Sequence, residues 1–113
     1  MKYILMIYRD EAAFQAMEPT NTHSPAYMAY GQALQQAGAL VDGRRLRPAD
    51  TASTVRSKDG KVEVLDGPYS DTREQLGGYF LIDAPDLDAA IAWAARCPGA
   101  AQGAVEVRPL WEM

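Results

Sequence analysis

Two short segments are apolar on both of their alternating faces, and they constrain the fold more than any other feature of the chain. Residues 2–8 and residues 77–83 are typical of β-strands, in which successive side chains point to opposite sides. A strand that is apolar on both sides is a central strand, covered above and below. The sequence therefore predicts a sheet with these two runs at its centre.

Two helices are indicated by apolar positions at the spacing i, i+3, i+4, i+7. The first begins after Ser24, which can cap it, with Pro25 at its first position, and Gly38 ends it. The second begins after Asp86 as its cap, and Pro98-Gly99 stops it. Each helix follows one of the two central strands, which favours an α+β arrangement.

Further strands are predicted at residues 40–46, 51–57, 61–65 and 105–108. Asp59-Gly60 lies between the second and third of these, and such a pair is a strong hairpin signal. Residues 66–75 are expected to form a polar loop, and residues 9–22 a loop with a short helix near 12–17. Without the inserted β-hairpin the order is β-α-β-β-α-β, the ferredoxin-like plan, in which the first and third strands are central.

The chain of 113 residues has room for one domain, residues 1–113. Two helices can cover only one face of such a sheet, and an exposed apolar face marks an interaction surface. We therefore expect a homodimer whose two sheets face each other around a possible cavity. The alternative is a monomer whose loops cover that face.

The charge balance of −4 argues against nucleic-acid binding, which needs clustered cations. Arg44, Arg45 and Arg47 are most simply a solvated strand edge, with an anion clamp as the alternative. One cysteine and one histidine exclude a multi-cysteine or multi-histidine metal site, and no metal or cofactor is expected. The apolar N-terminal run is too short to cross a membrane and lacks a cleavage site, so we expect a cytoplasmic protein.

Residues 66–76 hold the densest set of chemically capable side chains. Asp66 and Glu74 are candidate catalytic acids, because a carboxyl group beside aromatic rings can move a proton. Tyr69 and Tyr79 are candidate walls of a binding site. Arg9 or Arg108 would hold a negative group of the substrate. The plainer interpretation is a turn, since Asp, Gly and Pro are all turn formers.

Within this segment, Asp66-Gly67-Pro68-Tyr69 and the run Thr72-Arg73-Glu74-Gln75-Leu76-Gly77-Gly78-Tyr79 closely resemble the signature of the DGPF family, a branch of the YCII-related proteins. The resemblance extends over almost the whole chain. It implies a dimeric α+β barrel with the ferredoxin-like plan. It implies no settled reaction, because members are small bacterial proteins that are mostly unassigned. Many are encoded beside extracytoplasmic-function sigma factors, which implies a functional link.

Two departures from the family pattern bear on function. Tyr69 stands where the motif usually has Phe, and residues 25–38 lack the helix histidine of broader YCII-type proteins. The lone His23 precedes that helix; a solvated residue is its plainer interpretation, and substrate binding is the functional one. Cys97 is expected to be a buried hydrophobe, and Trp111 to pack at the dimer seam.

Three functions stay open at this stage. The first is an enzyme using acid/base chemistry on a small molecule that is anionic or bears a carbonyl group. The second is a non-catalytic ligand-binding or regulatory module linked to a sigma factor. In the third, the motif at residues 66–78 has a structural role alone.

Overall fold

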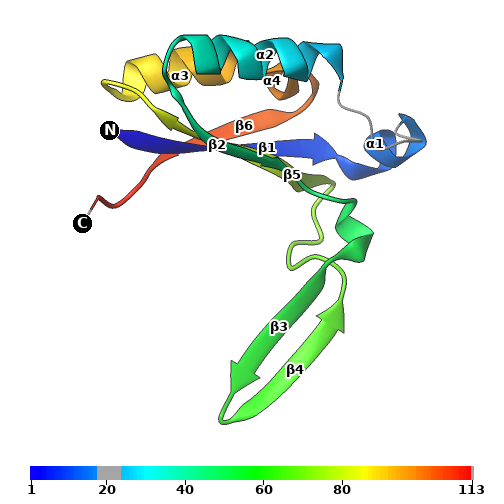
Figure 1. Cartoon of the computed structure of the whole chain (residues 1–113). Helices are drawn as coiled ribbons and strands as arrows, with labels where there is room; N and C mark the ends of the chain where they lie inside the picture. The colour runs from blue at the N-terminus through cyan, green and yellow to red at the C-terminus, as the bar shows by residue number, and fades with distance from the viewer. Residues whose placement is uncertain (18–23, 113) are drawn as a thin grey trace.

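The computed structural model describes residues 1–17 and 24–112, and its main sheet has four antiparallel strands in the order β2-β5-β1-β6. The two runs that are apolar on both faces lie in β1 and β5, so the prediction of the central pair is confirmed. The prediction of a mixed α+β fold with the ferredoxin-like order is also confirmed (Figure 1). The strands are β1 (Lys2–Asp10), β2 (Leu40–Arg45), β5 (Glu74–Asp83) and β6 (Ala104–Pro109).

One face of this sheet is covered by α2 (Pro25–Gln36), α3 (Leu87–Arg96) and α4 (Pro98–Gln102), as Figure 1 shows. Beneath them lies a core in which the largest side chains lose all or nearly all contact with solvent: Leu5, Leu34, Ile82 and Cys97. The Tyr30 hydroxyl donates a hydrogen bond of 2.6 Å to the Trp93 carbonyl, which ties α2 to α3. Burial of these apolar side chains is the main stabilising contribution to the fold.

The predicted helix caps are confirmed. The Ser24 hydroxyl oxygen accepts a hydrogen bond from the Tyr27 amide at 3.2 Å, and Pro25 is the first helical residue. Gly38 follows α2 with φ +72°, a conformation that glycine adopts without steric cost. The Asp86 carboxylate accepts from the Ala89 amide at 2.9 Å and caps α3.

The expected loop at residues 66–75 is wrong at its end, because Glu74 and Gln75 belong to β5. They pair with Asp10 and Arg9 of β1, which also runs two residues longer than expected. A bulge at Gly77 shifts the register between the two halves of β5 and hides the continuation of the strand in the sequence. A side chain at Gly78 would lie 2.7 Å from the Arg44 carbonyl oxygen, so the glycine permits the close approach of β2.

A further difference from expectation lies directly after α3. Pro98-Gly99 does more than end α3, since Pro98 is also the first residue of α4. Proline suits that position, because its missing N–H has no partner in a first helical turn. The short helix predicted near residues 12–17 is confirmed as α1 (Glu11–Met17).

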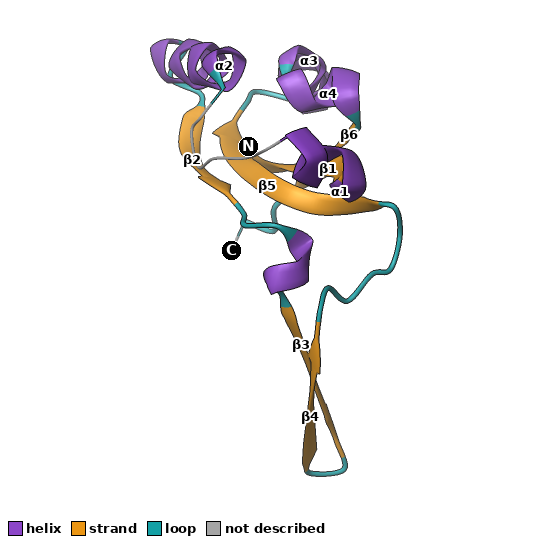
Figure 2. Ribbon diagram, turned by 90° about the vertical axis from the view of Figure 1, so that its right-hand side faces the viewer, coloured by secondary structure: helices purple, strands orange, loops and turns teal. Residues whose placement is uncertain are grey.

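The inserted hairpin, β3 (Ser53–Lys58) and β4 (Lys61–Asp66), projects away from the rest of the molecule (Figures 1 and 2). We call residues 53–66 the arm. Its tip is the predicted Asp59-Gly60 turn, with φ of +52° and +78°. A one-turn helix, η1 (Ala49–Thr51), leads into it. The base is closed by a 2.7 Å hydrogen bond from the Gly67 amide to the Ala52 carbonyl.

Candidate functional site

The face of the sheet opposite the helices, which we call the open face, is apolar along its middle and charged at both edges. No helix in the part of the chain that the structure describes covers it (Figure 1). The strand register places six large side chains along its middle: Ile4, Met6, Tyr8, Leu76, Tyr79 and Leu81. An ion pair lies on each flanking strand, Asp42–Arg44 on β2 and Glu106–Arg108 on β6.

A hollow of about 710 Å³ lies at one end of the open face. The hollow lies between β1, β5, β6 and residues 72–73, which precede β5. The residues that line it are Tyr8, Asp10, Thr72, Arg73, Glu74, Ala104, Val105 and Glu106. Its volume is in the range of small-molecule sites. The hollow is therefore the candidate functional site.

Three carboxylates line the hollow, and two of them are already engaged. Asp10 accepts from the Ala13 amide at 3.0 Å, which caps α1, and pairs with Arg73 Nε at 3.1 Å. That amide, followed by the charge of Arg73, holds the pKa of Asp10 below its ordinary value. Glu106 pairs with Arg108. Glu74 forms no ion pair with any residue that the structure describes.

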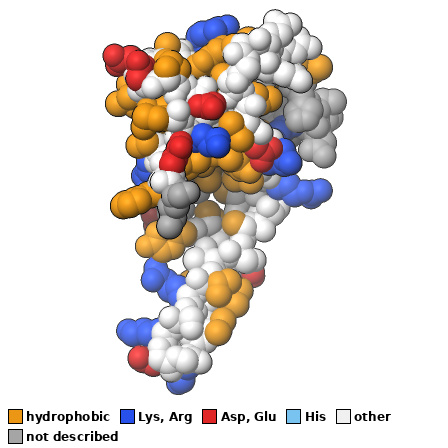
Figure 3. All heavy atoms as spheres, turned by 60° about the vertical axis from the view of Figure 1, so that its left-hand side comes forward, with side chains coloured by type: hydrophobic (Ala, Val, Ile, Leu, Met, Phe, Trp, Pro, Cys, Tyr) orange, Lys and Arg blue, Asp and Glu red, His pale blue; other side chains and the backbone are white. Residues whose placement is uncertain are grey.

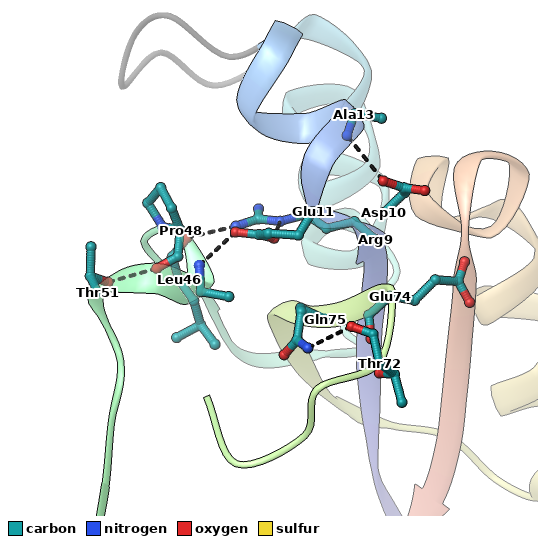
Figure 4. A network of polar contacts seen from close by, with 11 residues as sticks. Arg9, Asp10, Glu11, Ala13, Leu46, Pro48, Thr51, Thr72, Glu74 and Gln75 are labelled. Carbon is teal, nitrogen blue, oxygen red and sulfur yellow. Dashed lines mark hydrogen bonds and ion pairs between the residues drawn. The ribbon is translucent and has the colours of Figure 1, made fainter. Parts of the chain in front are cut away.

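The opposite side of the same strand ends is filled by Arg9, as Figure 4 shows. Its guanidinium pairs with Glu11 Oε2 at 3.3 Å and donates to the Leu46 carbonyl at 3.4 Å. It also lies 3.4 Å from the centre of the Phe14 ring, a cation–π contact. Glu11 in turn accepts from the Ala49 amide at 2.5 Å, so Arg9 ties β1 to the segment that leads to the arm.

Gln75 lies beside Arg9 on this side and is only 8% exposed. Its side-chain amide donates to the Ser70 carbonyl at 2.6 Å and to the Thr72 carbonyl at 2.8 Å. Figure 4 shows the bond to Thr72. These bonds hold the loop between the arm and β5 in place. Part of the family-like motif therefore has a structural role. This role of Gln75 was not predicted from the sequence.

The candidate residues do not all meet. Glu74 lines the hollow, and Tyr79 and Arg108 lie on the open face with it. Arg9 is on the opposite side of the sheet. Asp66 ends β4 on the arm, paired with Ser53. Tyr69 is 76% exposed beside Arg56, away from the hollow's lining residues, and His23 lies outside the described residues.

The residues that surround Glu74 were not predicted from the sequence. Tyr8 and Asp10 are two positions apart on one strand and so point to the same face. Ending the strand at residue 8 concealed that relation. Glu106 was treated only as the polar partner of an alternating strand. Continuing the two-residue alternation past Tyr8 would have found Asp10.

The described part of the chain offers neither a cluster of metal ligands nor an accessible thiol. No group of three or more His, Cys, Asp or Glu residues there could hold a metal ion. Cys97 is buried, as expected, and burial raises the pKa of its thiol. None of the described helices has the length and apolar character needed to cross a bilayer.

The four-stranded antiparallel sheet, helices on one face and a hollow on the other define a ferredoxin-like α+β protein with an open sheet face. A sequence model of the YCII-related domain matches residues 1–113, and the chain belongs to that family. It is 36% identical over 114 residues to an uncharacterized protein of Rhizobium meliloti (strain 1021), R00369. The similarity covers 97% of this chain and 92% of that relative.

Proposed function

We propose that the protein binds a small molecule in the hollow and that Glu74 transfers a proton to or from it. The observation that carries the proposal is the state of the three carboxylates. Asp10 and Glu106 are held in ion pairs, and Glu74 has no such partner among the described residues. A carboxylate without a competing cation is available to a ligand, which is the first requirement of a general acid or base.

The surroundings of Glu74 indicate the chemistry of the ligand. Tyr8 and Ala104, which lie opposite each other, offer an aromatic and a small aliphatic surface, and Asp10 and Arg73 neutralise each other. The Glu74 carboxylate therefore gives the hollow an excess of negative charge. A compact molecule with an apolar body and a donor group, or an acidic C–H beside a carbonyl, fits better than an anion. We therefore propose a neutral or cationic ligand in place of the anionic one considered from the sequence.

We also propose that a second copy of the chain covers the open face. The middle of that face is apolar, and each flanking strand carries one cation beside one anion. A surface with both signs of charge can meet its own copy with opposite charges aligned. Facing sheets would enclose the hollow, which is open in the single chain. Trp111, 93% exposed in the single chain, is expected at the same seam.

The test is native mass spectrometry of gently purified protein, followed by a ligand-retention comparison of Glu74→Gln with Glu63→Gln. Both variants lose one negative charge, but Glu63 lies on the arm and not in the hollow. We expect a retained small molecule in the wild type and the control, and its loss or weakened retention in Glu74→Gln. Equal retention in both variants would remove Glu74 from the site.

A specific observation favours a second candidate, a non-catalytic ligand-binding or regulatory module. Asp66 is on the arm, so the hollow lacks the second candidate acid. The two candidate cations are both engaged, Arg9 with Glu11 on the opposite side of the sheet and Arg108 with Glu106. In this case the ligand would modulate a protein partner, and the resemblance makes a sigma factor the candidate. Turnover of the retained molecule by the wild type, abolished in Glu74→Gln, would exclude this alternative.

A further inference from the structure

The arm is amphipathic, with three valines on one face and most of its charged side chains on the other. In an antiparallel pair, directly opposed residues point to the same side. One face carries Val55, Val62 and Val64, which are 60–66% exposed. The other carries the charged side chains Arg56, Lys58, Lys61 and Glu63. Figure 3 shows hydrophobic side chains gathered along one side of the arm and basic ones along the other.

A two-stranded ribbon of this kind is at best marginally stable in water when nothing packs against it. Neither β3 nor β4 pairs with the main sheet. The ribbon is held at its base by the Gly67–Ala52 bond and by the Thr54 hydroxyl, which donates to the Gly67 carbonyl at 2.8 Å. Three valines exposed on one face are an unfavourable arrangement unless another surface covers them.

The total surface of the chain points the same way. A compact protein of 12.4 kDa exposes about 6,100 Å², whereas this chain exposes 8006 Å². Its radius of gyration is 15.7 Å, against about 13 Å for a compact chain of this length. The excess of roughly 1,900 Å² is in the range that one subunit of a large obligate homodimer buries.

We propose that the arm is a clasp, and that its valine face packs against a second copy of this chain. This rests on the homodimer proposed above and adds to it. The arm extends from the body on the side of the open face, away from the helices (Figure 1). The valine face and the open face are therefore available to the same neighbouring copy. By two-fold symmetry each copy gives one arm and receives one.

The clasp assigns Asp66 to the contact between the two copies. It lies on the same face as the three valines, at the base of the arm, by the alternation of β4. When the arm is seated, the Asp66 carboxylate lies at the contact between the two copies and not in the hollow of its own chain. The two acids of the family-like motif thus serve different surfaces, Glu74 the hollow and Asp66 the seam.

The test compares two adjacent lysine substitutions, Val64→Lys and Leu65→Lys. The two residues are 60% and 58% exposed and lie on opposite faces of the arm. Burial of one valine contributes enough that placing a charge there should weaken the dimer at least about tenfold. We expect Val64→Lys to raise the dissociation constant in sedimentation velocity to that extent, and Leu65→Lys to change it little. Unchanged thermal melting of the separated subunits shows that the body is still folded.

A third variant, Met6→Lys on the open face, separates this proposal from the proposed dimer of facing sheets. If Met6→Lys dissociates the dimer and Val64→Lys does not, the sheets face each other and the clasp is wrong. Equal weakening by Val64→Lys and Leu65→Lys also overturns the clasp, because no face of the arm is then preferred. A wild type that is monomeric at every concentration overturns both. A photo-crosslinking residue at position 64 gives an independent readout, with covalent dimers expected there and not at position 65.

Discussion

Where the end of β1 pairs with the start of β5, the two faces of the sheet carry residues with different roles. On the helix side, Arg9 and Gln75 use their side chains to hold the neighbouring chain, through Glu11, Leu46, Ser70 and Thr72. On the open side, Asp10 and Glu74 line a hollow, and Glu74 has no ion pair among the described residues. Adjacent positions in a strand point to opposite faces. A single step along the chain therefore separates a structural residue from a candidate functional one.

The same contrast holds for the sheet as a whole. The covered face has a dense core of fully buried side chains, whereas the open face keeps large apolar side chains partly exposed. The covered face supplies the hydrophobic core of the single chain. The open face, together with the arm, is suited to contacts beyond it. Mutations on the two faces should therefore differ in kind as well as in size.

The largest effect is expected from Leu34→Ala in the core, where the side chain has no solvent exposure. Removal of a fully buried leucine leaves a cavity and lowers the free energy of unfolding by about 2–5 kcal/mol. Leu81→Ala, on the open face, should instead cause a loss of stability that depends on protein concentration, because it weakens the proposed contact between two copies. Chemical denaturation at several protein concentrations distinguishes the two, and an equal, concentration-independent loss would contradict the contrast.

A smaller loss of stability is expected from a substitution at Gln75, which is adjacent to Glu74 in β5 but on the opposite face of the sheet. Gln75→Glu replaces the amide donor with an oxygen facing the carbonyls of Ser70 and Thr72. The buried hydrogen bonds are lost, and the new oxygen repels the two carbonyl oxygens. The free energy of unfolding should therefore fall by about 1–3 kcal/mol. Glu74→Gln, the reverse change at the next position, should leave stability unchanged. Urea titration of both variants makes the measurement, and a matching loss in Glu74→Gln would show that it too is structural.

The smallest effect concerns Asp10 at low pH. Its pKa in the folded chain lies below the ordinary value of 3.8, chiefly because the Ala13 amide donates to the carboxylate. The unfolded chain therefore binds this proton first as pH falls, and the stabilisation present above pH 3.8 is lost as pH falls through the folded pKa. Asp10→Asn should flatten the dependence of melting temperature on pH in this acid range. An identical pH dependence in variant and wild type would assign the acid sensitivity to other carboxyls.

Much of the fold could be predicted from the sequence, because its main signals are local or periodic. The apolar runs of β1 and β5, the caps Ser24 and Asp86, and the Asp59-Gly60 turn each carry their own physical reason. The start of β5 could not be predicted this way. Its polar residues resemble a loop, and the bulge at Gly77 breaks the alternation that would have revealed the strand.

The candidate site was predicted only in part. Glu74, Tyr79 and Arg108 do share the open face, but Asp66 and Arg9 were grouped with them on sequence grounds alone. Which face a strand residue takes depends on register, and register depends on pairing with a distant strand. The position of Asp66 depends on the arm, whose direction no local pattern encodes. Asp10 was missed because the strand was taken to end too early.

The order of the strands has a consequence for synthesis on the ribosome. β1 is the first strand to emerge, but both of its neighbours, β5 and β6, come from the second half of the chain. During translation its apolar residues have no pairing partner until Glu74–Asp83 has been made, and the sheet is complete only after Pro109. The arm, whose contacts are local, can form earlier. Long-range pairing of this kind is slow and leaves apolar segments open to aggregation. Of the strands of the main sheet, β1 is therefore exposed to aggregation for the longest time.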